Sequence, residues 1–261
     1  MDDKSIELAA HWIHNSQHIV ILTGAGVSKE SGVPTFRDGE GSLWEQYDPM
    51  EIATYRALKE KPKVVWDFYQ YRLNKMGDAK PNPGHLALAK LQDYKVNVTI
   101  IAQNIDDLHE QAGSKDVIHL HGRINRYKCT TNCQGNPTLI DIKSAAHDDK
   151  TKPPLCPHCG EFIRPDVVLF GEILPEDELN RAEELSLKCD LMIVIGTSGL
   201  VSPADSLPKK AKRNNATVIE INPAYSMITR VADLKIEAPS GMIMPKIIAA
   251  LETLQGAKSN E

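Results

Sequence analysis

Cysteine spacing gives the clearest chemical signal in this sequence. Four of its five cysteines form two close pairs: Cys129 with Cys133, and Cys156 with Cys159. Paired thiolates at this spacing suit tetrahedral zinc, and four protein ligands leave no position open for a substrate. Four free buried thiols, or His158 in place of one cysteine, are the alternatives. Pairing within a polar, proline-rich stretch favours a structural zinc site held by the four cysteines.

A glycine turn is the second candidate site. The apolar run 18–23 leads directly into Gly24, Ala25 and Gly26, and Ser28 follows in a predicted helix. Glycines let a pyrophosphate approach the backbone, and the start of a helix offers free N–H groups and a positive dipole end. Ser28 and Lys29 fill the region where a third glycine would come, so the fingerprint of hydride-transferring enzymes is absent. A turn without chemical consequence is the alternative.

Further apolar runs predict the elements that position these residues. Runs rich in β-branched residues occupy 97–102, 116–121, 191–195 and 216–221, and helical patterns occupy 5–15, 85–92 and 176–188. Strands alternating with helices predict an α/β fold: a Rossmann-like parallel sheet with helices on both faces. Polar motifs at 103–106, 196–198 and 222–223 follow three of the runs. Residues just after parallel strands line one crevice, so these motifs should converge.

Two segments interrupt the alternation and are predicted to form a smaller lobe. Residues 36–82 are rich in helix formers, and residues 123–165 carry the paired cysteines. We therefore expect a large Rossmann-like domain from 1–35, 83–122 and 166–255, a helical insertion at 36–82, a zinc module at 123–165 and a frayed tail at 256–261.

Composition narrows the class of protein. Of 261 residues, 41% are hydrophobic and 25% charged, as in a globular enzyme. Only 5% of the residues are aromatic, which argues against a surface on which nucleic-acid bases stack. The net charge of −5 argues against a broad basic surface that binds phosphates. The acidic start lacks a signal-peptide pattern, and the apolar runs are too short to span a bilayer. We expect a soluble cytoplasmic protein without disulfides, in which Cys189 is a small core residue.

Taken together, these motifs resemble those of the sirtuins, a family of NAD-dependent protein lysine deacylases. The similarity runs in the family's order over roughly residues 5–250, through the paired cysteines and the segments 24–37, 103–109, 119–122, 170–172, 196–198 and 221–223. It implies NAD as co-substrate, one structural zinc and acyl-lysine protein substrates. The acyl group is passed to ADP-ribose, with release of nicotinamide and O-acyl-ADP-ribose.

The resemblance also implies residue roles. His121 would be the general base on a ribose hydroxyl, with Asn104 and Asp106 at the nicotinamide ribose and carboxamide, whereas His119, His85 and His109 would be structural. Phe36 would shield the reactive carbon, Arg37 would meet phosphate, and Ser240 would lie near adenine. The full set implied for the cofactor is Gly24, Ala25, Gly26, Ser28, Phe36, Arg37, Gln103, Asn104, Ile105, Asp106, Gly196, Thr197, Ser198, Asn222, Pro223 and Ser240.

Two edges are implied to hold the peptide as an added strand. Their residues are Val168, Phe170, Gly171, Glu172 and Val201.

The spacing of Tyr69 and Arg72 bears on the acyl group. Three residues apart on a predicted helix, they share a face and could clamp a carboxylate. This pair resembles that of the desuccinylase–demalonylase subgroup of bacterial and mitochondrial type. A plain deacetylase in which Arg72 only packs, a mono-ADP-ribosyltransferase and a non-enzymatic NAD-binding scaffold are the alternatives. No obligate nucleic-acid partner and no membrane partner are expected.

Overall fold

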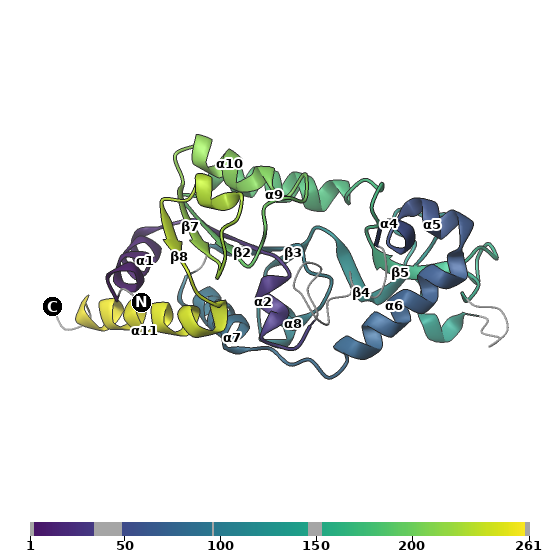
Figure 1. Cartoon of the computed structure of the whole chain (residues 1–261), viewed down its shortest axis with the longest axis horizontal. Helices are drawn as coiled ribbons and strands as arrows, with labels where there is room; N and C mark the ends of the chain where they lie inside the picture. Colours follow the sequence, from purple (N-terminus) through teal and green to yellow (C-terminus); the bar gives the residue numbers. More distant parts are fainter. Residues whose placement is uncertain (1–2, 34–48, 96, 146–152, 259–261) are drawn as a thin grey trace.

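The computed structural model describes residues 3–33, 49–95, 97–145 and 153–258. Its long axis runs from a larger lobe built on a sheet to a smaller lobe of helices and a two-stranded ribbon (Figure 1). The predicted cofactor residues Phe36 and Arg37 lie outside the described residues.

A six-stranded sheet of parallel strands forms the larger lobe, in the order β3-β2-β1-β6-β7-β8. Its strands are β1 (Ile19–Thr23), β2 (Val98–Ala102), β3 (Val117–His119), β6 (Leu191–Ile195), β7 (Thr217–Ile221) and β8 (Leu234–Ile236). Every residue of β1, β2 and β6 is buried, which explains why these strands read as continuous apolar runs. The predicted parallel sheet is confirmed, and β8, only three residues long, was not predicted.

Helices cover both faces of this sheet, as predicted (Figure 1). One face packs against α1 (Asp3–Asn15), α7 (Pro83–Tyr94) and α11 (Ser240–Lys258), and the other against α9 (Glu176–Lys188) and α10 (Ser206–Arg213). The tail that the sequence assigns to 256–261 overlaps the end of α11, which continues to Lys258. Leu251 is buried in the core and Leu254 packs against it, so the last turns of the helix remain anchored.

The smaller lobe combines α4 (Pro49–Ile52), α5 (Tyr55–Glu60) and α6 (Pro62–Met76) with β4 (Gly122–Cys129) and β5 (Ile163–Val167). The two strands pair antiparallel, with a register shift between Arg123 and Tyr127. Phe68 of α6 packs in one apolar cluster with Val167 and Leu169, so the helical insertion is fixed to the strand that leads into the predicted peptide edge.

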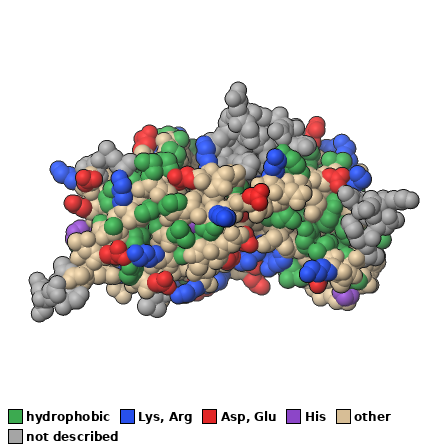
Figure 2. Space-filling view, turned by 90° about the horizontal axis from the view of Figure 1, so that it is seen from below, with side chains coloured by type: hydrophobic (Ala, Val, Ile, Leu, Met, Phe, Trp, Pro, Cys, Tyr) green, Lys and Arg blue, Asp and Glu red, His purple; other side chains and the backbone are tan. Residues whose placement is uncertain are grey.

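Short elements complete the chain: α2 (Gly26–Lys29), α8 (Leu108–Gln111) and the 3-10 turns η1 (Ile142–Ser144) and η2 (Ile228–Arg230). On the face seen in Figure 2, lysine and arginine side chains are interspersed with aspartate and glutamate. None of the helices in the described ranges combines the length and apolar character needed to cross a membrane.

Candidate functional site

The order of the strands places a crevice between β1 and β6. On one side of β1 the sheet continues with β2 and then β3. On the other side, β6 is followed by β7 and then β8, so the order of addition reverses between β1 and β6. Loops leaving two such neighbouring strands diverge to opposite sides and open a ligand site at their carboxyl ends. The turn at Gly24 and the motif at 196–198 follow β1 and β6 directly, so they meet at this switch point.

Both glycines of the turn are required by close packing of two backbones. A Cβ at Gly24 would lie 2.7 Å from the Thr197 Cβ, and one at Gly26 would lie 2.7 Å from the Gly196 Cα. The Gly24 N–H donates to Ile195 O (2.9 Å), and the Gly26 N–H donates to Gly196 O (2.8 Å). The turn therefore packs backbone to backbone against residues 196–197, which brings the ends of β1 and β6 into direct contact at the crevice.

A hydrogen-bonded chain joins Asn104, Ser28 and Asp106. The Asn104 Nδ2 donates to Ser28 Oγ (2.8 Å), whose hydroxyl donates to Asp106 Oδ2 (3.0 Å). The other carboxylate oxygen of Asp106 accepts from the Leu108 N–H at 3.2 Å. Within the described part of the chain, the buried Asn104 Oδ1 has no hydrogen-bond partner. A buried acceptor in this state suits a ligand hydroxyl.

A hydrogen bond to the backbone fixes the orientation of the His121 ring. Its Nδ1 lies 2.7 Å from Gln103 O, and a carbonyl only accepts, so Nδ1 carries the hydrogen and Nε2 keeps its lone pair. Burial lowers the His121 pKa, and the hydrogen bond to Gln103 opposes that shift. The sequence predicted that the strand would continue through His121, but β3 ends at His119, and His121 lies in the turn before β4.

Other predicted cofactor residues interlock across three strand ends. The Gln103 Nε2 donates to Thr197 Oγ1 (3.1 Å), and the Asn222 Nδ2 donates to Thr197 O (2.8 Å). Ser198 is half-buried beside them, and its carbonyl accepts from the Met227 N–H. The remaining predicted residues are the half-buried Ala25 and Ile105, the exposed Pro223, and the buried Ser240 at the start of α11.

The predicted peptide edge is held by backbone bonds to two other segments. The Val168 N–H donates to His121 O (3.0 Å), which ties the edge to the proposed base. The Phe170 N–H donates to Ala53 O, and Phe170 O accepts from the Tyr55 N–H. Gly171, at φ +87°, makes the turn that follows. On the opposite loop, the predicted residue Val201 is half-buried.

Tyr69 and Arg72 lie one turn apart on α6, each 4% exposed. Burial raises the pKa of Tyr69 to about 12, although the guanidinium groups of Arg72 and Arg164 oppose the shift. Burial lowers the pKa of Arg72, and the nearby Tyr69 and Asp106 oppose that change. The guanidinium carbon lies 6.0 Å from the centre of the Phe68 ring. The pair thus presents a protonated phenol and a guanidinium in a largely apolar setting.

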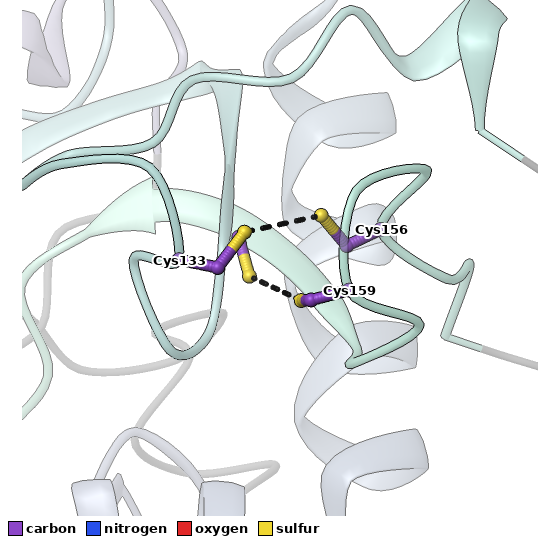
Figure 3. Close-up of side chains that lie close together, drawn as sticks. Cys133, Cys156 and Cys159 are labelled. Carbon is purple, nitrogen blue, oxygen red and sulfur yellow. Dashed lines mark hydrogen bonds between the residues drawn. The ribbon is translucent and has the colours of Figure 1, made fainter.

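The paired cysteines converge from two segments, the end of β4 with the loop after it and the loop before β5 (Figure 3). All four sulfurs lie within 4.8 Å of one another, with 3.5 Å between Cys129 and Cys159 and 3.9 Å between Cys133 and Cys156. Tetrahedral zinc with bonds of about 2.3 Å separates its sulfurs by about 3.8 Å, so the cluster fits this ion. The four cysteines would hold one zinc, as the sequence predicted, and the ion would join the two loops.

Histidines outside the site have structural contacts. The rings of His85 and His109 lie 4.9 Å apart, both buried, and His109 Nε2 lies 3.1 Å from Thr23 Oγ1. His119 Nε2 lies 2.6 Å from Glu110 Oε1, on the outer strand β3.

Sequence reasoning missed the contribution of Arg164. This residue is 5% exposed in β5 and forms an ion pair with Glu172, which the sequence assigned to the peptide itself. An arginine in a polar stretch gives no sign of burial, because its partner is fixed only by the turn that follows β5. Ala53 and Tyr55, which bind the Phe170 backbone, carried no chemical signal either.

Comparison with known proteins identifies the family. The sequence profile of the Sir2 family matches residues 24–203. The chain belongs to the Sir2 family. An NAD-dependent protein deacylase of Pyrococcus abyssi is 45% identical over 94% of this chain and 97% of its own length.

Solved structures agree with this assignment. A complex of a Sir2 homologue with NAD has a TM-score of 0.84 at 41% identity, covering 97% of this chain and 95% of the other. A complex of Sir2 with a p53 peptide and NAD+ has a TM-score of 0.82 at 32% identity, covering 95% of this chain and 98% of the other. For this Sir2-family protein, the unpartnered Asn104 acceptor at the crevice fits NAD, and the cysteine cluster fits zinc.

Proposed function

We propose that this Sir2-family enzyme, an NAD-dependent protein deacylase, removes succinyl and malonyl groups from lysine side chains and also accepts acetyl-lysine. The observation that carries the proposal is the burial of Tyr69 and Arg72 on one face of α6. Tyr69 packs in the cluster that contains Val167 and Leu169, which lead into the predicted peptide edge. An acyl chain entering from that edge would meet these two side chains.

Electrostatics favours an acidic acyl group in that position. A guanidinium held away from water gains most from an ionised partner, because charge-assisted hydrogen bonds strengthen where the dielectric constant is low. The Tyr69 phenol keeps its proton at neutral pH, since its pKa is about 12, and would donate to the same carboxylate. An acetyl group brings no charge to this position and would gain no charge-assisted hydrogen bond there.

The residues at the crevice support acyl transfer to ADP-ribose. NAD, when bound there, would supply an electrophilic ribose carbon for the acyl oxygen, with nicotinamide as the leaving group. Asn104 Oδ1 would accept from a ribose hydroxyl, and Asp106 would accept from the carboxamide N–H of nicotinamide. The Nε2 of His121 would remove a proton from a ribose hydroxyl. This nitrogen is available because the other ring nitrogen, Nδ1, is bonded to Gln103 O. With one water molecule consumed, the products would be free lysine, nicotinamide and O-acyl-ADP-ribose, and the substrates acylated proteins.

A paired assay tests the acyl preference. Succinyl-, malonyl- and acetyl-lysine forms of one peptide are incubated with NAD, and mass spectrometry follows peptide, nicotinamide and O-acyl-ADP-ribose. Arg72→Met should raise KM for the succinyl peptide by roughly tenfold to a hundredfold, the effect of losing a charge-assisted contact, and spare deacetylation. Arg56→Met is the matched control, because Arg56 lies in the same lobe with its side chain 83% exposed.

The outcomes separate the alternative functions. Turnover of the acetyl peptide alone would make the protein a plain deacetylase in which Arg72 packs. An equal loss of both activities in Arg72→Met would refute the carboxylate clamp. Labelled ADP-ribose attached to protein, with no deacylated peptide, would indicate ADP-ribosyl transfer instead.

A further inference from the structure

A buried ion pair lies beside the predicted peptide edge without belonging to the crevice or to the cysteine cluster. Arg164 Nη2 lies 2.8 Å from Glu172 Oε1 and 2.9 Å from Oε2, with the two side chains only 6% and 17% exposed. In the described part of the chain, Nε and Nη1 of Arg164 have no hydrogen-bond partner. Within those described residues, the Arg164 guanidinium donates its hydrogen bonds to the Glu172 carboxylate.

Glu172 also shapes the backbone of the peptide edge. The same Oε2 accepts from the Leu169 N–H at 2.9 Å, and the Glu172 N–H donates to Leu169 O at 3.0 Å. The turn 169–172 is therefore closed by one side-chain bond and one backbone bond. Phe170, inside this turn, is bound through its N–H and its carbonyl to Ala53 and Tyr55. Arg164 anchors the carboxylate, and the carboxylate anchors the turn.

This arrangement leaves particular backbone groups available. With the Val168 N–H on His121 O and Phe170 turned toward α5, the Val168 carbonyl and the Gly171 N–H make no backbone hydrogen bond within the described ranges. An extended peptide that adds to a strand edge needs such groups in a fixed direction. The closed turn sets that direction.

Charge balance makes Glu172 difficult to replace. Arg164 faces Lys128 across the β4–β5 ribbon, and like charges opposite each other destabilise a strand pair. Asp166 is already engaged by Lys128 (3.0 Å) and by Arg126. Without Glu172, Arg164 would be a buried cation beside a second cation, and its turn would have to rearrange to expose it.

We propose that Arg164 and Glu172 form a positioning pair that fixes the peptide edge and sets the affinity for the substrate backbone. Glu172 then acts on the peptide through Leu169 and Gly171 rather than by contact. The inference rests on the proposed deacylase function, but it is independent of acyl preference. It predicts a defect in peptide binding that leaves NAD binding and the acyl-transfer step unchanged.

The test uses the full chain with an acetyl-lysine peptide, whose turnover does not depend on the Arg72 clamp. Steady-state KM values for peptide and for NAD, kcat and thermal midpoints are measured for wild type, Glu172→Gln, Arg164→Met and Arg164→Lys. Glu183→Gln removes the α9–α10 ion pair with Lys210 and is the matched control. Calorimetric titration of the peptide into protein saturated with ADP-ribose gives Kd directly, so variants with low turnover remain measurable.

Glu172→Gln and Arg164→Met should raise KM and Kd for peptide about tenfold or more, with kcat and KM for NAD within about threefold of wild type. Arg164→Lys keeps the charge and should recover most of the affinity, and Glu183→Gln should match wild type. Unchanged peptide KM and Kd in both disruptive variants would overturn the proposal, as would an equal loss of NAD and peptide affinity. A wild-type enzyme without preference for the succinyl peptide, by contrast, would count only against the Tyr69 and Arg72 assignment.

Discussion

Acid should destabilise this fold through two buried histidines, His85 and His109. Burial, the largest cause in each case, lowers the pKa of His85 to about 4 and that of His109 to about 3. The neighbouring His85 lowers the His109 value further, whereas Asp106 opposes the shift at His85. In an unfolded chain a histidine titrates at about 6.5. Both imidazoles are therefore neutral in the folded protein at pH values where the unfolded chain is already protonated.

The sign and size of the effect follow from proton linkage. Below pH 6.5 the unfolded state binds protons that the folded state excludes, so the free energy of unfolding falls as pH falls. Each histidine contributes about 1.4 kcal/mol per pH unit, which gives about 2 kcal/mol at pH 5. Together they remove about 4 kcal/mol, a large share of the ~5–15 kcal/mol typical of a folded domain. The loss levels off near pH 4 for His85 and near pH 3 for His109.

Urea unfolding followed by circular dichroism at pH 8 and pH 5 measures this effect by difference. Wild type is compared with His109→Gln, whose amide can still reach Thr23 Oγ1 but does not titrate. The variant should lose about 2 kcal/mol less than wild type between the two pH values. His11→Gln, which removes an exposed histidine of α1, should lose as much as wild type.

The carboxylates contribute equally to the change in unfolding free energy of all three proteins, so their contribution cancels in the comparison. If His109→Gln and wild type lost the same free energy on acidification, His109 would have to be protonated within the fold. The burial argument for its pKa would then be refuted. A smaller loss in His11→Gln than in wild type would instead point to a surface effect.

Three further predictions concern the site and its supports. Burial lowers the His121 pKa, so the acid limb of the kcat/KM profile should lie below pH 6.5. The His121→Ala variant should lose roughly a hundredfold or more in turnover. An acid limb above pH 7, or full turnover of the variant, would contradict the assignment of His121 as the base. Elemental analysis should find one zinc per chain, and the Cys156→Ser variant should lose the ion and unfold at a lower temperature. Folded and active protein without zinc would exclude a structural metal. Gly26→Ala should cost about 1–3 kcal/mol in urea unfolding and weaken NAD binding in calorimetric titration, because its Cβ would meet the Gly196 backbone; wild-type stability and affinity would contradict the required close approach.

Local patterns in the sequence determined the sheet, the metal cluster and the crevice. The strands β1, β2, β6 and β7 read as apolar runs because parallel strands covered by helices need no polar alternation. The cysteine spacing was informative because two short knuckles must each present two thiolates to one ion. The crevice followed because parallel strands end on one side, which brings Gly24, Gln103, Thr197 and Asn222 together.

The tertiary structure decided what depends on contacts between distant segments. That His121 lies in a turn, with Nδ1 on Gln103 O, depends on where β3 ends and not on the strand-like character of its sequence. The local sequence does not mark Arg164 as buried, and only the turn after β5 brings Glu172 to it. The low pKa values of His85 and His109 likewise depend on two helices, α7 and α8, packing their rings together away from water. Sequence periodicity reports which face of an element is buried, but the partner of a buried charge is set by the three-dimensional path of the chain.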